Sequence, residues 1–541
     1  MAEYRQSQQP GQHEFSFAAG SLPDGVYFAT ASLNGQTSTL KLLKSGRSAG
    51  GNPQIVYRNW SAADTDPVRK ITAADLYTYI GYAAGYFPAV LAEVLPAAGH
   101  SYEFFLLPLT SRGISTGATV PVYEMDVPTT GGTVTVSTED CPIKGMEITV
   151  PDSAFPESRT FSISYAPVQS HSYGANFNPI SPMIVVRNGG GYSDEPMIIR
   201  IPVKVQSDEF AMAFLYNELT GTLEGMPILA ADASSITVAT RHFATSQISN
   251  FAPDEKRASK RIADAFANII ISSIKESSLK GQQILTTGFT PGKDDWEFTN
   301  RGSVLASGGH CAGQSLSMMW YYYEQRLNGA GQLFHSLDRL YIPCTNGDSL
   351  WMDNPKGYKF ASIIQKEYVN FASWMDGQLR KLRDSSGHSI GWRAFQYSML
   401  LTGEPQYVAL RRQKADGAQA GHAIITHKIS VTEKKIFVTD PNYPGQERSI
   451  VFSDPYFAPY DTKQNANEPA SEQYPWIAYI AKTCLVNWSA ITARFAEVQA
   501  GTIGTVAPYL FPQVSLRDKT ENAVISPSAD YVSSRDTLVI T

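Results

Sequence analysis

One cysteine near the middle of the chain has the surroundings of a nucleophile. Cys311 follows the glycines Gly308 and Gly309 and precedes apolar residues at helical spacing in the segment 316–327. This pattern predicts that Cys311 stands at the start of a buried amphipathic helix. The N-terminus of a helix carries partial positive charge and unpaired N–H groups, which favour the nucleophilic thiolate over the thiol. The glycines would let a substrate backbone approach, and the Cys311 N–H could donate to an oxyanion.

A base and a residue to orient it follow on two strand-like runs. His422 begins one apolar run, and Asp440 ends the next, with a turn around 432–435 between them. His and Asp at adjacent strand ends can share a hydrogen bond that fixes the imidazole tautomer. If His422 and Asp440 were directly opposite each other, the turn between their strands would be centred near Val431, before the predicted turn at 432–435. We therefore expect a bulge or a diagonal contact. His427 is a rival base, but it lies five residues on and points to the opposite face.

Three short motifs in this order resemble the papain-like cysteine peptidases, and among them the YopT/AvrPphB branch of secreted bacterial effectors. The motifs are Gly-Gly-His-Cys-Ala-Gly-Gln-Ser-Leu-Ser-Met-Met-Trp at 308–320, Gly-His-Ala at 421–423 and Asp-Pro-Asn-Tyr-Pro-Gly at 440–445. The resemblance implies a papain-like α+β domain in which Cys311 is the nucleophile, His422 the general base and acid, and Asp440 the residue that orients the imidazole.

The oxyanion hole is where the chain departs from that family. Papain has a Gln six residues before its Cys, and Leu305 stands at that position here. The best substitute donor upstream is the side-chain amide of Asn300. The resemblance therefore predicts Asn300 as a fourth catalytic residue, a donor to the oxyanion.

Short alternating runs separated by turn residues predict an all-β region at 129–250. This region resembles the ZU5 domain, a β-sandwich of some death-domain receptors and bacterial surface proteins, through Ile-Thr-Val-Pro-Asp-Ser-Ala-Phe-Pro at 148–156 and Arg-His-Phe-Ala at 241–244. Some ZU5-like domains cleave themselves at a His-Phe-Ser triplet. Ala244 stands at the Ser position and carries no nucleophile, so we expect no self-cleavage and a structural role for His242 and Phe243.

The whole chain is predicted to be multidomain: β-rich N-terminal modules, including the ZU5-like β-sandwich, followed by the papain-like α+β domain. The predicted parts are a flexible Gln-rich tail at 1–12, a β-rich or α+β domain of unknown role at 13–128, the ZU5-like β-sandwich at 129–250, the papain-like domain at 251–500 and a small β appendix at 501–541.

Two apolar segments predict helices. The papain-like domain is expected to open with an amphipathic helix at 254–280, which Gly281 would end. The most apolar stretch, 77–98, is interrupted by Pro88, Glu93 and Pro96, which argues against a membrane-spanning helix. We expect a buried helical hairpin there.

Composition excludes several classes of function. The 541-residue chain carries 44 Lys and Arg against 50 Asp and Glu, a net charge of −6, which argues against a nucleic-acid partner. Its four cysteines form no CxxC pair, which disfavours a zinc ribbon or a disulfide scaffold. His310, His335 and Cys344 match no familiar zinc spacing, and Asp348 and Asp353 lack the EF-hand pattern. We therefore expect neither a metal nor a cofactor.

The polar start of the chain, Met1–Gln6, has no apolar signal-peptide region. Secretion or a cell-surface location is favoured if a leader was removed.

The predicted activity is thiol-dependent acyl transfer, with hydrolysis of peptide bonds in a protein or peptide substrate as the reaction. The same triad could instead carry out transglutaminase- or deamidase-type transfer. A third alternative is a non-catalytic binding or adhesion protein with a papain-like shell. In each case the β domains would dock the protein on a surface or partner.

Overall fold

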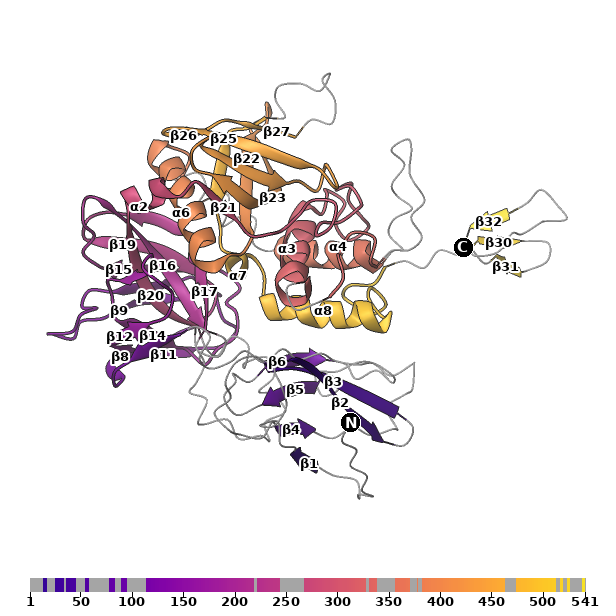
Figure 1. Cartoon of the computed structure of the whole chain (residues 1–541), viewed down its shortest axis with the longest axis horizontal. Coiled ribbons are helices and arrows are strands. Elements are labelled where there is room, and N and C mark those ends of the chain that lie inside the picture. Colours follow the sequence, from indigo (N-terminus) through magenta and orange to yellow (C-terminus); the bar gives the residue numbers. More distant parts are fainter. Residues whose placement is uncertain are drawn as a thin grey trace.

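The computed structural model describes residues 113–217, 221–243, 267–326, 330–337, 356–369, 377, 382–462 and 473–511, and the backbone of further strands near both ends. The structure is β-rich, with several sheets and more than one domain, as the sequence predicts. Its main body has two parts, a two-sheet domain (residues 114–275) and a mixed domain (residues 276–511), shown in indigo to magenta and in pink to yellow in Figure 1.

Two antiparallel sheets enclose the core of the two-sheet domain, where Ile148, Phe161 and Ile199 are fully buried. One sheet has the order β18-β19-β15-β10-β9 and contains β9 (Gly132–Thr135), β10 (Glu147–Val150), β15 (Met197–Pro202), β18 (Ile228–Ala231) and β19 (Ser235–Thr240). The other has the order β17-β16-β20-β14-β11-β8 and contains β8 (Val120–Val127), β11 (Arg159–Ala166), β14 (Met183–Arg187), β16 (Glu209–Asn217), β17 (Thr222–Gly225) and β20 (Ala267–Lys275), with β13 (Asn178–Pro179) paired to β20. A separate pair joins β7 (Ile114–Thr116) to β12 (Val168–His171).

Of the described residues in the predicted helix at 254–280, the prediction is wrong for 267–275 and right for 276–280. Residues Ala267–Lys275 form strand β20, which lies between β16 and β14, and only Glu276–Gly281 is helical, as α2. The run Ile269–Ile271 is buried on both sides, so it is continuously apolar and lacks the alternation of a half-buried strand. Such a run cannot be distinguished from a buried helix by periodicity, although its β-branched residues favour a strand. The sheet therefore draws strands from beyond both ends of the predicted range 129–250.

The predicted helical hairpin at 77–98 is also wrong, because the backbone there forms two antiparallel strands, β5 (Tyr77–Tyr82) and β6 (Ala89–Val94). These strands continue a sheet with β1 (His13–Ser16) and β4 (Gln54–Tyr57), and β2 (Gly25–Leu33) pairs with β3 (Gln36–Lys44). At the other end of the chain, β30 (Leu516–Asp518) pairs with β31 (Ala523–Ile525) and β32 (Leu538–Ile540).

The mixed domain is built on an antiparallel sheet of order β26-β25-β24-β23-β22-β29, with β21 paired to β23. Its strands are β21 (Ile284–Thr286), β22 (Gln406–Gln413), β23 (Gln419–Ser430), β24 (Lys435–Thr439), β25 (Glu447–Ser453), β26 (Tyr456–Phe457) and β29 (Trp476–Tyr479), beside the short pair β27 (Tyr460–Asp461) and β28 (Gln473–Tyr474). The helices are α3 (Cys311–Tyr321), continued by the π-helical turn η3 (Tyr322–Arg326), α4 (Lys356–Val369), α6 (Ser385–Thr402), α7 (Lys482–Leu485) and α8 (Trp488–Ala500).

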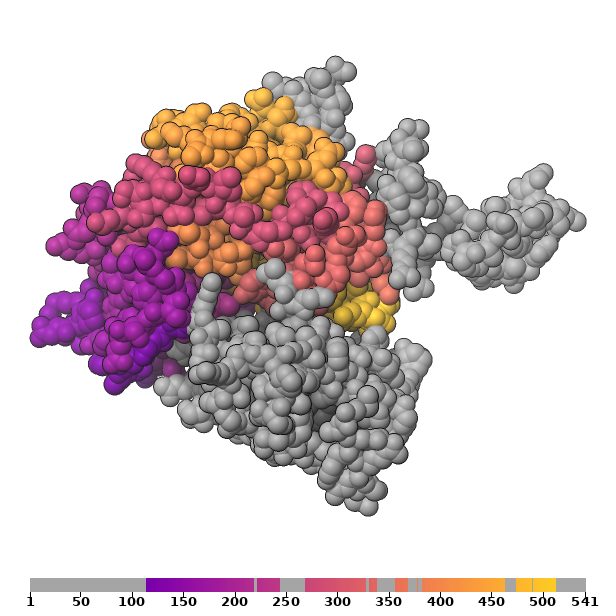
Figure 2. Space-filling view, in the orientation of Figure 1, coloured from indigo at the N-terminus to yellow at the C-terminus, as the bar shows by residue number. Residues whose placement is uncertain are grey.

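The helices of the mixed domain lie in two groups. Helices α3, α4 and α8 lie together and share a core with the sheet, in which Trp320 is buried (Figure 1). Helix α6 lies between the sheet and the two-sheet domain, and its Tyr397 hydroxyl is 2.8 Å from Ser272 Oγ of β20. One hydrophobic core, containing Phe214 and Phe395, runs through both domains. Figure 2 shows the two domains in contact, and both contribute residues to this core.

Candidate active site

Helix α3 begins at Cys311, as the sequence predicts. The preceding His310 is buried, and its Nδ1 lies 2.9 Å from Gln314 Oε1, while Gln314 Nε2 donates to the Phe298 carbonyl at 2.8 Å. These bonds fix the first turn of the helix. The residue Cys311 is partly exposed, whereas the rest of the helix is buried.

A close contact with α4 sets the position of this helix. The Gly313 N–H donates to Gln365 Oε1 at 2.9 Å, which satisfies one of the N–H groups left unpaired at a helix start. A Cβ on Gly313 would overlap the Ala361 carbonyl, so only glycine permits this approach. Gly313 therefore serves helix packing, because the backbone of α4 occupies the space where its side chain would lie.

His422 and Asp440 are bonded to each other at the end of the β23–β24 hairpin. The distance from His422 Nε2 to Asp440 Oδ1 is 2.7 Å, and the two side chains are 5% and 0% exposed. The register explains how they meet. Ile425 pairs with Thr439, so Asp440 comes opposite Ile424 and reaches His422 diagonally along the same face.

The bulge expected from the sequence is present in β23. Thr426 pairs with Val438 and Lys428 with Phe437, which leaves His427 as an extra residue. Without it, the same turn would place Asp440 opposite Ile425, on the other face of the sheet from His422. The bulge therefore brings the imidazole and the carboxylate to one side.

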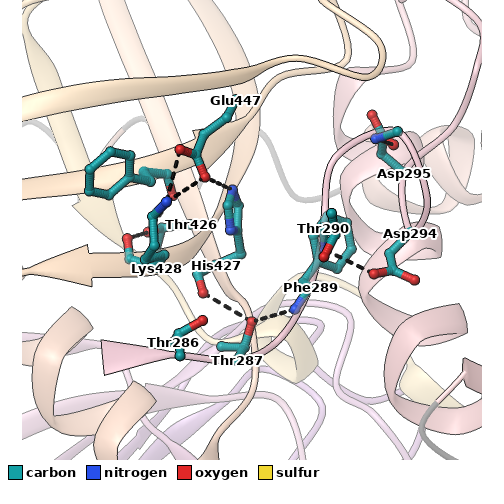
Figure 3. A network of polar contacts seen from close by, with 12 residues as sticks. Thr286, Thr287, Phe289, Thr290, Asp294, Asp295, Thr426, His427, Lys428 and Glu447 are labelled. Atoms are coloured by element: carbon teal, nitrogen blue, oxygen red, sulfur yellow. Dashed lines mark hydrogen bonds and ion pairs between the residues drawn. The ribbon is translucent and has the colours of Figure 1, made fainter. Parts of the chain in front are cut away.

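The bulged residue has its own polar network (Figure 3). Its carbonyl accepts hydrogen bonds from the Thr287 N–H at 3.1 Å and from Thr287 Oγ1 at 3.0 Å. Its Nε2 lies 3.8 Å from Glu447, which also pairs with Lys428 at 2.8 Å. Burial lowers the pKa of His427 to about 4. His427 thus takes no part in the Cys311 site, and it helps to hold the bulge.

The Cys311 thiol and the His422 imidazole lie close enough to shift each other's pKa through hydrogen bonding and charge. Because His422 Nε2 is bonded to Asp440, Nδ1 is the ring nitrogen that remains for the thiol. Sulfur, imidazole and carboxylate thus form one continuous chain, and the structure brings together the three residues of the predicted triad. The backbone of Ala423 also bonds to Cys311.

The charges in this chain favour a thiolate beside an imidazolium. Burial alone would raise the pKa of the Cys311 thiol, but the hydrogen bond and charge of His422, with the charge of Arg411, outweigh it and lower the pKa. Burial alone would lower the pKa of His422. The charge and hydrogen bond of Asp440 outweigh burial, so the pKa lies well above its usual value. Both shifts act in the direction that makes proton transfer from sulfur to imidazole easier.

The Asp440 carboxylate is kept ionised by its surroundings. Burial raises its pKa, but the charge and hydrogen bond of His422 outweigh burial, so the pKa is lowered. The Asn442 N–H donates to Oδ1 at 2.8 Å and the Tyr460 hydroxyl donates to Oδ2 at 2.8 Å, and both bonds act in the same direction. The carboxylate is thus fully buried and hydrogen-bonded at both oxygens.

Asn300 lies beside the start of α3, and its amide joins two loops. Its Oδ1 accepts a hydrogen bond from the His310 N–H at 2.6 Å, and its Nδ2 donates to Asn442 Oδ1 at 3.2 Å. His310 directly precedes Cys311, and Asn442 lies two residues after Asp440, so Asn300 connects the loops next to these two residues. Its role as an oxyanion donor stays a prediction.

Sequence reasoning missed Arg411 and Tyr460. Arg411 is buried on β22 opposite Gly421, and its two-residue basic run with Arg412 reads as a solvated face. Tyr460 stands 20 residues after Asp440, with no local pattern to connect the two. Of the two residues, only Arg411 has a related feature in the sequence. This feature is Gly421, directly before His422, which pairs with Arg411 across β22 and β23.

The remaining predicted features have these positions. His242 and Phe243 are buried, and His242 stacks on Tyr192 with ring centroids 4.7 Å apart, while Ala244 lies outside the described residues. Cys344, Asp348 and Asp353 also lie outside them. Within the described part of the chain, no three His, Cys, Asp or Glu residues are grouped so that they could hold a metal ion.

Comparison with models of known protein families gives no match, and comparison with curated proteins gives none either. Among the helices whose residues are described, none has the length and apolar character needed to cross a membrane.

Proposed function

We propose that the mixed domain is a papain-like cysteine hydrolase that cleaves peptide bonds by acyl transfer through a thioester. The observation that carries this proposal is the hydrogen-bonded chain from Asp440 through His422 to Cys311 at the N-terminus of α3. A nucleophile, a base and an orienting group joined in this order are the parts that acyl transfer needs.

In the proposed reaction, the Cys311 thiolate attacks the carbonyl carbon and forms a tetrahedral intermediate. The imidazolium of His422 then gives its proton to the leaving amine, the C–N bond breaks, and a thioester remains on the sulfur. Water attacks the thioester and loses a proton to His422 Nδ1. The carboxylic acid product leaves, and the thiolate–imidazolium pair is restored. Throughout, Asp440 holds the ring by Nε2.

The oxyanion would be stabilised first by the backbone. The N–H of Cys311 belongs to the first turn of α3, where N–H groups have no intrahelical acceptor. The helix dipole adds positive potential at the same point. The second N–H of the Asn300 amide is the candidate side-chain donor, because one N–H of this group already bonds to Asn442.

We infer that the two-sheet domain is ZU5-like and serves as a rigid mount for the hydrolase. Support comes from the shared hydrophobic core and from contacts across the boundary, such as the Tyr479 hydroxyl, which donates to the Gly225 carbonyl at 2.7 Å. A mount of this kind would orient the active site relative to a surface or partner.

The test is product analysis by mass spectrometry with a library of unstructured peptides and the full-length protein. Cleavage should produce new amino termini with the wild type and none with Cys311→Ala, while Cys141→Ala and Cys484→Ala should stay active. Adding a primary amine during the reaction separates hydrolysis from transamidation, because only a transferase attaches the amine to the acyl product. Cleavage that survives Cys311→Ala would contradict the proposal.

Alkylation by iodoacetamide tests the alternative of a non-catalytic shell. An activated Cys311 should react well below pH 8, whereas the pKa of the buried Cys484 is raised to about 12 and it should stay unmodified. An unreactive Cys311 in the folded protein would favour the shell.

A further inference from the structure

The buried carboxylate of Asp440 has one donor that the triad itself does not require. The hydroxyl of Tyr460 donates to Oδ2 at 2.8 Å, while Oδ1 accepts from His422 Nε2 at 2.7 Å and from the Asn442 N–H at 2.8 Å. The two carboxylate oxygens therefore have different partners. Oδ1 faces the imidazole, and Oδ2 is held by a phenol from another strand.

We propose that Tyr460 is a positioning residue of the candidate active site, which holds the Asp440 carboxylate ionised and turned so that Oδ1 faces His422. The inference rests on the proposed function and adds a fourth side chain to its hydrogen-bonded chain. Its physical basis is that a buried carboxylate needs donors at both oxygens.

Tyr460 is well suited to remain a donor. Burial and the neighbouring Asp440 charge raise the pKa of its phenol well above the usual value, and Arg448 opposes them only in part. The phenol thus keeps its proton at neutral pH. Since Asp440 is anionic under the same conditions, the hydrogen bond is charge-assisted and stronger than one between neutral groups.

The fold holds Tyr460 in place independently of Asp440. It pairs with Tyr474 across β27 and β28, and the Tyr474 ring centroid lies 6.1 Å from that of His422. Arg448 of β25 donates to the Asp461 carbonyl at 2.9 Å, and its guanidinium lies 5.5 Å from the Tyr460 ring centroid. Cys311 and Asp440 act directly on His422, while Arg411 acts on Cys311 and Arg448 on Tyr460; the Tyr474 ring also lies against His422.

The experiment compares Tyr460→Phe with a matched control, Tyr456→Phe, which removes the same hydroxyl from an exposed tyrosine of β26. The first readout is the pKa of His422, measured by NMR on full-length protein with labelled histidine in a Cys311→Ala background. Without the Tyr460 hydrogen bond the carboxylate can turn away from the ring, and a carboxylate that no longer aims Oδ1 at Nε2 stabilises the imidazolium less, so the His422 pKa should fall. The control should leave it unchanged.

The second readout is activity with intact Cys311. Tyr460→Phe should lower kcat about tenfold or more, the loss expected for one hydrogen bond to a charged group, with little change in KM. A merely structural tyrosine would lower thermal stability without moving the imidazole pKa, and that result would overturn the inference. If the wild type proves inactive while Tyr460→Phe still lowers the His422 pKa, the proposed function fails and the role of Tyr460 toward Asp440 stands.

Discussion

The guanidinium of Arg411 occupies the space that the absent side chain of Gly421 leaves open. The two residues pair across β22 and β23, and a Cβ on Gly421 would overlap the Nη1 atom of Arg411. This packing holds a buried positive charge close enough to act on the Cys311 thiol. The charge of Arg411 is one of the influences that lower the pKa of Cys311. The glycine of the Gly-His-Ala motif thus has a physical role in the electrostatics of the site.

Gly421→Ala should therefore make the Cys311 thiol less reactive. The new methyl group would displace the Arg411 guanidinium, and the thiol pKa would rise toward its ordinary value. The rate of Cys311 alkylation at pH 6 should fall several-fold, and Arg411→Gln should reproduce the loss without adding bulk. Gly281→Ala, where a Cβ meets nothing within 4 Å, is the control. Normal alkylation in both Gly421→Ala and Arg411→Gln would show that the arginine charge does not act on the sulfur.

Asp440→Asn should lower activity by about 10²–10⁴-fold, because a neutral amide no longer supports the imidazolium. The raised pKa of His422 would fall, so the pH range in which the thiolate–imidazolium pair exists should narrow from its alkaline side. The measurement is the pH profile of Cys311 alkylation. An unchanged pH profile would mean that Asp440 does not set the pKa of the His422 imidazole.

Asp440→Asn should also change how the unfolding free energy depends on pH. The lowered pKa of Asp440 stabilises the folded state above the unfolded-state pKa, near 4, and this contribution disappears as the pH falls through the lower folded value. The unfolding free energy of the wild type should thus fall more steeply below about pH 4 than that of Asp440→Asn. Urea unfolding between pH 2.5 and 6 measures the difference; parallel curves would contradict it.

Sequence patterns predicted those parts of the site whose cause is local. The helix starting at Cys311 follows from residue periodicity, and the His422 and Asp440 strands follow from their apolar runs. The need for a bulge followed from counting residues between the two. Tyr460 could not be found in this way, because it lies in a separate two-stranded pair, β27 and β28, and only tertiary packing brings it to Asp440.

The failures of the fold prediction share one cause. Strand β20 is buried on both faces, so Ile269–Ile271 show no alternation, and the segment before it carries charges at a spacing that suits a helix. Only the neighbouring strands β16 and β14 decide between the two structures, and such long-range pairing leaves no local signal. The β5–β6 hairpin was missed in the same way, because its apolar residues also lack clear alternation.

Gly313→Ala tests the approach of α3 to α4. Its Cβ would overlap the Ala361 carbonyl, so the helices must separate. We expect a loss of about 1–3 kcal/mol in unfolding free energy, typical of an overpacked core, and slower Cys311 alkylation because the helix start moves. Gly391→Ala on α6, where the nearest atom lies 3.7 Å from the new Cβ, is the control. Full stability with full reactivity would show that the contact is not restrictive.

A buried ionic cluster joins the mixed domain to the two-sheet domain. Lys482 pairs with Glu404, and its charge also acts on Glu224 of β17 and on Glu324. The carboxylates outnumber the ammonium group, and burial is the main cause that raises the pKa of Glu224 and of Glu324. The positive charge of Lys482 therefore offsets part of the negative charge of these three glutamates.

Lys482→Met should destabilise the protein by about 3–5 kcal/mol at pH 8, since it leaves Glu404 buried without its partner. A carboxylate whose folded pKa is raised destabilises the folded state above that pKa, and protonation removes the penalty as the pH falls through it. The loss should thus be smaller at pH 5 than at pH 8. Lys280→Met, at an exposed pair with Glu276, should change stability by less than about 1 kcal/mol. Equal losses for Lys482→Met at both pH values would contradict the electrostatic explanation and indicate lost packing alone.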